Sequence, residues 1–190
     1  MGKLKESEKD KIRKELNKDI LDQTSISLMV NSYEDIFSTF DPRSYDYKAL
    51  SVDFLDEVRR ATRDKNNQLE VFLLVPKKNR NFEKESHIRK RMFDHFKRHH
   101  DIVAKEIDRI KKKGWIMTIS GILMIFLATL LFSYHNTNLF INFLIILFEP
   151  GGWFTAWTGL DEIYYTARSK EPDLEFNRKM AHATIHFASY

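Results

Sequence analysis

The sequence predicts an α/β membrane protein, in which a small cytosolic α/β domain of about three strands and two to three helices is interrupted by a two-helix transmembrane hairpin. The first observation is a charge-free segment from Trp115 to Tyr134. At about 1.5 Å per residue, a helix of this length can cross a bilayer. The second is another apolar segment, Leu139 to about Leu160, after a short polar break. The third is that helix and strand patterns lie on both sides of these segments.

Residues 5–23 have the pattern of an amphipathic helix. Ile12, Leu16 and Ile20 recur on one helical face, and charged residues occupy the rest. Because this apolar stripe is thin, we expect the helix to be either peripheral or packed against a partner. Ser25 to Val30 then largely alternates between polar and apolar side chains, which predicts a strand.

Residues 31–48 are predicted to form a long ordered loop. Such loops are uncommon in small domains unless they are functional or tied down by their own side chains. The loop follows a strand, where α/β sheets often bind ligands. Four of its residues form a candidate ligand-binding loop: Asp41, Arg43, Tyr45 and Tyr47. In the alternative, which we favour, Asp41 caps a turn at Pro42 and Arg43 pairs with a carboxylate.

A helix from Ser51 to about Asp64 and a strand from Leu69 to Val75 are predicted next. Ser51 is placed to cap the helix. The near-continuous apolar run of the strand predicts a central, buried position in the sheet. The strand–helix–strand order favours a right-handed parallel crossover.

Residues 81–113 predict one long helix that continues into the first apolar segment. Its apolar stripe consists of Ile88, Met92, Phe96, His99, Val103, Ile107 and Ile110. The stripe can pack on the sheet of its own chain, or on the same helix of a second copy as a short coiled coil. We favour the first, because the strands need a cover.

The same region is strongly basic, with 14 Lys and Arg against 6 Asp and Glu in residues 77–113. We expect its last turns to contact anionic lipid headgroups through Arg109, Lys111, Lys112 and Lys113. Nucleic acid is not an expected partner, because no binding motif accompanies the charge. Basic residues flank both apolar segments and none lies between them, so both termini are expected on the cytoplasmic side of a plasma or inner membrane.

The end of the chain is predicted to rejoin the first domain. Ala183 to Tyr190 alternates and predicts a last strand, which would pair with the sheet begun before the hairpin. The expected organisation is therefore a first part of the α/β domain (1–114), the hairpin (115–160) and a C-terminal segment that returns to the domain (161–190).

A carboxylate and a helix-breaking triplet, Glu149-Pro150-Gly151-Gly152, lie inside the second apolar segment. They predict a break into two half-helices, since Pro150 has no amide hydrogen. In one interpretation Glu149 caps the second half-helix. In another the break lines an oligomer axis, where Glu149, with Asn142 on the same face, binds a cation or a proton.

In a third interpretation the bilayer ends near Glu149, and the following residues lie in the membrane interface. Four aromatic side chains are candidate interfacial anchors: Trp115, Trp153, Trp157 and Tyr164. A second segment of only ten residues would then need a thinned bilayer.

No enzyme, metal or cofactor signature is found. The pairs His95/His99 and His182/His186 have a metal-compatible spacing without a third ligand motif. We therefore expect a non-enzymatic, homo-oligomeric two-pass protein whose cytosolic domain senses a ligand or protein. Its hairpins would form or gate a pore, or perturb the bilayer. The alternatives are a membrane-anchored scaffold or assembly factor, with Glu149 a structural cap, and a membrane enzyme using Asp41, Arg43 or the histidines.

Overall fold

The computed structural model describes residues 24–65, 68–134 and 138–189. The chain divides into two compact units, one comprising Met1–His100 with Glu175–Tyr190 and the other Asp101–Leu174. The helix predicted for residues 5–23 lies outside the described residues. Each unit is considered by itself below.

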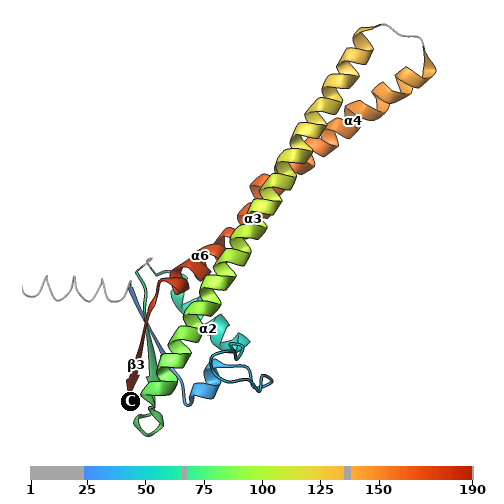
Figure 1. Ribbon diagram of the computed structural model, residues 1–190. Helices are drawn as coiled ribbons and strands as arrows, with labels where there is room; N and C mark the ends of the chain where they lie inside the picture. Colours follow the sequence, from blue (N-terminus) through green and yellow to red (C-terminus); the bar gives the residue numbers. More distant parts are fainter. Residues whose placement is uncertain (1–23, 66–67, 135–137, 190) are drawn as a thin grey trace, which may run out of the picture. The chain divides into compact units, whose positions relative to one another are not determined.

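The first unit contains a three-stranded parallel sheet in the order β1-β2-β3 (Figure 1). Its strands are β1 (Ser25–Met29), β2 (Glu70–Val75) and β3 (Thr184–Ser189). The predicted central position of the second strand is confirmed. The predicted return of the last strand to the same sheet is also confirmed, so residues 101–174 are inserted between two strands of one sheet.

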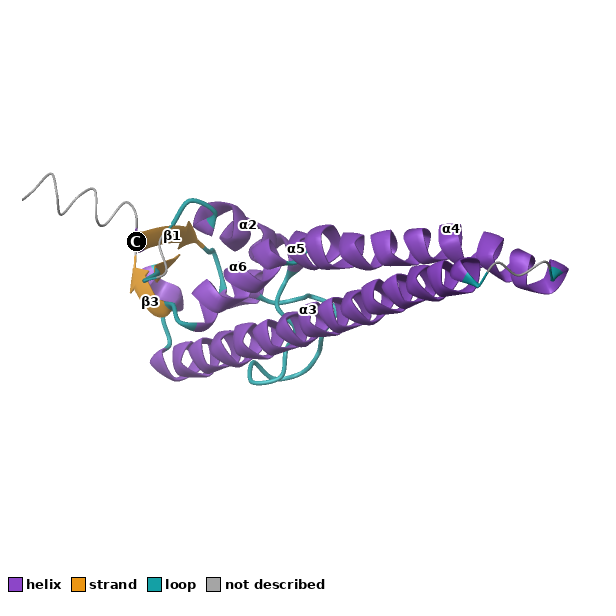
Figure 2. Cartoon of the chain, turned by 90° about the horizontal axis from the view of Figure 1, so that it is seen from above, coloured by secondary structure: helices purple, strands orange, loops and turns teal. Residues whose placement is uncertain are grey.

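Helices cover one face of this sheet (Figure 2). They are α2 (Val52–Thr62), the first part of α3 (Phe82–Ser133) and α6 (Glu171–Ala181). Ser51 occupies the N-cap position of α2, but its side chain makes no capping hydrogen bond, so the predicted cap is wrong in this respect. The helices and strands share one core, which includes Val30, Phe54, Val58, Val71, Leu73, Val75, Phe176, Met180 and Ile185.

The first part of α3 packs on this sheet. Ile88, Met92 and Phe96 are fully buried in the shared core, whereas His99 is exposed. The prediction that the stripe packs on its own domain is therefore confirmed for these three residues. The helix then continues without a break to Ser133, as the sequence predicted.

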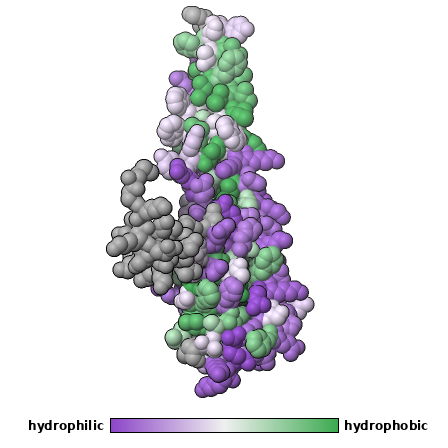
Figure 3. Space-filling view, turned by 90° about the vertical axis from the view of Figure 1, so that its left-hand side faces the viewer, coloured by the Kyte–Doolittle hydropathy of each residue, from purple (hydrophilic) through white to green (hydrophobic). Residues whose placement is uncertain are grey.

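The second unit is helical. The later part of α3 pairs with α4 (Leu139–Asp161), which is followed by a π-helical turn, η3 (Glu162–Thr166), and by α5 (Ala167–Ser169). Both long helices are long and apolar enough to cross a membrane, and only 17% and 6% of their most apolar windows are buried. Hydrophobic residues gather along the paired helices of this unit, in the upper part of Figure 3. The core helix of a soluble protein would be mostly buried instead.

The predicted break at Glu149-Pro150-Gly151-Gly152 is wrong. α4 runs through all four residues, with Pro150 inside the helix. Proline removes only one amide from the helical ladder, and apolar membrane-type helices tolerate it where neighbouring groups compensate. One of the two glycines, Gly152, has another role, in the contact with α3.

Candidate functional site

Glycines allow α3 and α4 to approach each other closely. A Cβ atom added at Gly121 would lie 2.4 Å from the backbone nitrogen of Ala156. One added at Gly152 would lie 2.7 Å from the carbonyl oxygen of Gly121. Any side chain at either position would therefore push the helices apart. Contacts of this kind between small residues are the usual way in which apolar helices pack in membranes.

A second glycine contact lies two turns nearer the start of the apolar segment. A Cβ atom at Gly114 would lie 2.7 Å from the carbonyl oxygen of Gly159, and one at Gly159 would lie 2.5 Å from the Thr118 nitrogen. Gly114 and Gly121 are seven residues apart, and so are Gly152 and Gly159. A seven-residue spacing keeps both glycines of a helix on the same face, so the two contacts form one continuous seam.

Two ion pairs join α3 to the residues that follow α4, at Glu162 in η3 and at Lys170 just after α5. The Lys113 Nζ lies 2.8 Å from Glu162 Oε1, and the Lys170 Nζ lies 3.0 Å from Glu106 Oε1. Lys113 was predicted to contact lipid headgroups. It is engaged with Glu162, although its side chain is still 64% exposed. The other three predicted lipid-contact residues, Arg109, Lys111 and Lys112, are exposed.

Glu149 is exposed on α4 and opens onto a cavity of about 240 Å³ between α3 and α4. The other residues that line this cavity are Ile125, Ala128, Thr129, Phe132, Ile145 and Trp153. The Thr129 hydroxyl donates to the Ile125 carbonyl oxygen of its own helix at 2.9 Å. Among the described residues no hydrogen bond or ion pair of Glu149 is observed. Because Glu149 lies within a continuous helix, the interpretation as an N-cap is wrong.

The other predicted residues of the second unit lie on its surface. Asn142 is exposed on α4, two turns before Glu149. The side chains of Trp153, Trp157 and Tyr164 are 60%, 68% and 66% exposed. Two shallow hollows of about 550 and 460 Å³ meet along this strip, and they share Trp157 and Asp161. Trp115, near the start of the other apolar segment, is also exposed.

In the first unit, Asp41 and Arg43 form an ion pair. The Arg43 Nε and Nη2 donate to the Asp41 carboxylate at 2.9 and 2.8 Å, and the Ala49 amide donates to it at 2.7 Å. These hydrogen bonds hold the pKa of Asp41 far below its usual value, and the bond from the Arg43 side chain has the largest effect. An antiparallel bridge between Phe37 and Leu50 closes the loop. This is the arrangement expected from the turn interpretation of the sequence.

Tyr45 is also used inside the loop. Its hydroxyl donates to Glu34 Oε1 at 2.6 Å, and Lys48 forms an ion pair with the same carboxylate. Burial, followed by the bond to Glu34, raises the pKa of Tyr45 to about 12. Tyr47, by contrast, is 67% exposed, and the neighbouring Phe40 is 95% exposed.

The loop is attached to α3 at two points. His87 Nδ1 lies 2.7 Å from Asp46 Oδ1, and the Arg91 Nε donates to the Lys48 carbonyl oxygen at 2.8 Å. The loop is therefore an ordered surface feature held at its ends, by its own carboxylates and by a helix. Tyr47 is the member of the predicted ligand loop that projects most into solvent.

Sequence reasoning missed a buried polar cluster at the start of α3. Glu85, only 2% exposed, accepts from the Tyr33 hydroxyl at 2.6 Å and from the Arg80 Nε at 2.5 Å. The Asn81 amide donates to the Tyr33 hydroxyl at 2.9 Å. These bonds attach α3 to the turn after β1. No local pattern links Tyr33 with Glu85, because the pair is made by the fold.

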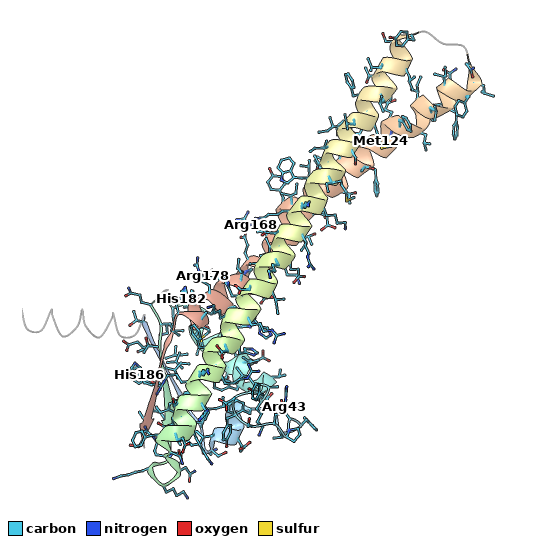
Figure 4. All side chains as sticks on the ribbon, in the orientation of Figure 1. Arg43, Met124, Arg168, Arg178, His182 and His186 are labelled. Atoms are coloured by element: carbon cyan, nitrogen blue, oxygen red, sulfur yellow. The ribbon has the colours of Figure 1, made fainter. Side chains whose placement is uncertain are left out.

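The histidines make ring contacts. His95 stacks on His99 with ring centroids 4.0 Å apart, and His186 stacks on Phe72 at 5.0 Å. Within the described part of the chain, no group of three potential metal ligands converges. Figure 4 shows His182 and His186 near the start of β3 and on it.

Comparisons of the chain with protein-family models, curated proteins and solved structures find no match. The function proposed below therefore rests on the geometry of the two units alone.

Proposed function

We propose that the chain is a non-enzymatic, two-pass membrane protein that forms homo-oligomers. In this proposal Glu149 lines a pore or a polar contact between copies, and the α/β unit lies on the cytoplasmic side, where it responds to a ligand or a protein. The observation that carries the proposal is that Glu149 lies inside an uninterrupted apolar helix, so it does not cap a helix end. It also forms no ion pair with a cation among the described residues.

The membrane location is supported by the composition and packing of the second unit. Large apolar side chains remain exposed along both helices, including Ile119, Leu123, Phe126, Phe132, Phe143, Ile146 and Phe154. In water so continuous an apolar surface would drive aggregation. In lipid it is the expected surface, and the glycine seam supplies the close packing that lipid-embedded helices need.

The depth of Glu149 makes its charge expensive. Ala128 and Thr129 line the same cavity and lie six and five residues before Tyr134. At 1.5 Å per residue, Glu149 is then roughly 8 Å inside the outer end of the first apolar segment. An isolated ionised carboxylate at such a depth is costly. It must be protonated, hydrated or bonded to groups of another chain, and a ring of copies around a wet axis provides all three.

The α/β unit has a direct covalent route to the hairpin. Ile88, Met92 and Phe96 are fully buried against the sheet, and the helix that carries them is the same α3 that begins the apolar pair. A ligand that repacks this core would therefore act on one end of an uninterrupted helix. Coupling through a two-state helix position is an established type of switch.

The test is Glu149→Gln in purified protein reconstituted into liposomes. We expect wild type to form a defined oligomer and to pass protons or small cations, and the variant to lose at least about tenfold of that flux, because the carboxylate ring is neutralised. Glu171→Gln, at an exposed carboxylate in the first turn of α6, is the matched control and should leave the flux unchanged.

Two results would contradict the proposal. The first is a monomer in both detergent and lipid nanodiscs, which leaves Glu149 without a second copy. The second is a flux that Glu149→Gln does not change.

One observation favours the scaffold as a second candidate. Phe40 and Tyr47 project 95% and 67% exposed from an ordered loop, as expected of anchors for a cytosolic protein. Under this alternative, capture of a partner by affinity purification survives Glu149→Gln but is lost in Phe40→Ser/Tyr47→Ser. Partner capture that survives the double substitution would remove the loop from the interface.

A further inference from the structure

The sheet of the first unit has one face without a cover among the described residues. The core residues of each strand point to α2, α3 and α6, and the alternate residues point to the opposite side. We call this opposite side the open face. It consists of Ser25, Ser27, Met29, Glu70, Phe72, Leu74, Thr184, His186 and Ala188. Parallel sheets are normally buried on both faces, so the open face is unusual.

The strand order explains why these helices share one face. The strands follow one another as β1-β2-β3, and each connection is a crossover between parallel neighbours. Right-handed crossovers that always step in the same direction put their helices on the same side. Since the helices of both crossovers lie on the other face, a cover from this chain has to come from outside them, and residues 1–23, which precede β1, are such a segment.

The open face becomes apolar toward the carboxyl ends of the strands. The pairing register places three rows across it: Ser25–Glu70–Thr184, then Ser27–Phe72–His186, then Met29–Leu74–Ala188. Met29 is 66% exposed, and Phe72 and Leu74 are partly exposed. A partner for this face must therefore be apolar over the second and third rows.

We propose that residues 5–23 of the same chain dock on the open face as an amphipathic helix, with Leu16 over Phe72 and Ile12 over Leu74. One residue, Thr24, separates the segment from the start of β1 at Ser25, so the segment is tethered at the amino edge of this face. A helix that turns back there runs antiparallel to β1. Four helical residues rise about 6.0 Å and two strand residues about 6.6 Å, so Ile20, Leu16 and Ile12 keep step with the three rows.

The size of the open face selects a helix rather than a second sheet. Three strands about 4.8 Å apart and six residues long span roughly 14 by 20 Å, or roughly 300 Å². A stable dimer usually needs about 800 Å² from each partner. One helix about 10 Å wide and about 28 Å long, the length of 19 residues, spans the length of the face and covers most of its width.

The chain contains no cysteine, so engineered pairs can test the docking directly. The experiment uses the full chain in detergent or lipid, carrying Leu16→Cys with Phe72→Cys or Ile12→Cys with Leu74→Cys. Lys14→Cys with Phe72→Cys is the matched control, because Lys14 lies on the opposite helical face from Leu16. After mild oxidation, we expect at least about fivefold more linked peptide from each facing pair than from the control, because only facing positions have disulfide geometry.

Mixing isotope-labelled and unlabelled chains before oxidation separates linkage within a chain from linkage between chains. Labelled-to-unlabelled peptides would mean that the occupant is the segment of a second copy, and would overturn the proposal. Equal yields from the facing and control pairs, or no linkage, would overturn it too.

A second measurement does not depend on a substitution in β2. His186→Cys introduces one thiol at an exposed position of the open face. Its alkylation rate should rise at least about fivefold when Leu16→Asp is added, since the helix no longer shields the face. Lys14→Asp should leave the rate unchanged. A rate that Leu16→Asp does not alter would count against docking.

Discussion

Gly121 is the residue on which the seam between α3 and α4 depends most directly. The Gly121→Ala substitution adds one carbon that would lie 2.4 Å from the Ala156 nitrogen, and that neighbour is backbone, which cannot rotate away. We expect the substitution to reduce the free energy of unfolding by about 1–3 kcal/mol, the usual cost of overpacking. The measurement is the thermal midpoint of the protein in detergent, which should fall.

A neighbouring glycine supplies the control for this prediction. A Cβ atom at Gly151 meets only the end of the flexible Met124 side chain, at 3.4 Å. Gly151→Ala should therefore leave the midpoint unchanged or raise it slightly, since alanine favours a helix. Equal losses at positions 121 and 151 would mean that the seam is not the close contact described above.

His95 gives the α/β unit a pH dependence that its carboxylates do not explain. Burial, followed by the charges of His99 and Arg91, lowers the pKa of His95 to about 4, from 6.5 in an unfolded chain. Between these values the unfolded state binds a proton that the folded state does not, so stability falls as the pH drops through this window. Carboxylates with lowered pKa values, such as Glu34, stabilise the fold fully above about pH 4.5, and this contribution is lost only as the pH falls below that value.

The measurement is the thermal midpoint at pH 7 and at pH 5. Wild type should melt at a lower temperature at pH 5, and His95→Gln should reduce that difference because its side chain does not titrate. His186→Gln, on the exposed side of β3, should keep the wild-type difference. The same decrease in all three proteins would exclude His95 as the cause.

At the scale of elements, two nearby residues of α4, Pro150 and Gly152, have opposite effects on the stability of the helix pair. Pro150 lies inside the helix, where it withholds one amide, whereas a Cβ atom added at Gly152 would lie 2.7 Å from the Gly121 carbonyl oxygen. We expect Pro150→Ala to keep or raise the thermal midpoint. Gly152→Ala should lower it, because overpacking reduces the free energy of unfolding by about 1–3 kcal/mol. If Pro150→Ala did not fold, Pro150 would be required for the structure, as expected if it marked a necessary helix break.

The elements that were predictable from the sequence are those with a local signal. β2 reads as a continuous apolar run, and the stripe of α3 repeats at helical spacing over many turns. The continuity of α4 was not predictable in this way. Pro150 and the two glycines after it match the local rules for a break, and the close approach of α3 that requires glycine comes from distant residues. The cluster of Tyr33 with Glu85 has no local signal for the same reason.

At the scale of the whole molecule, the sheet is completed by a strand that comes after the apolar pair. β2 pairs with β1 on one side and with β3 on the other. Its neighbours in space are therefore far apart in the chain, and folding of the sheet must wait for residues 184–189. Residues 101–174 form a separate compact unit between them, so each unit has its own contacts to satisfy.

This organisation predicts that the first unit can fold without the second. Residues 1–100 and 175–190 contain the complete parallel sheet and its core, and the Phe96 and Phe176 rings meet edge to face at 5.7 Å. The two ends to be joined, His100 and Glu175, therefore lie near a shared contact. A flexible linker of about ten Gly and Ser residues spans roughly 17 Å on average and should connect them.

We expect the linked protein to be soluble, because it lacks the apolar helices, and to unfold cooperatively with a mixed helix and strand circular dichroism spectrum. The control is a chain that ends at residue 174. It keeps the apolar pair but lacks α6 residues and β3, which leaves β2 as an edge strand with part of its core missing, so its sheet should not form. If the linked protein failed to fold while the truncated chain kept a native sheet, β3 would not be the strand that completes the domain.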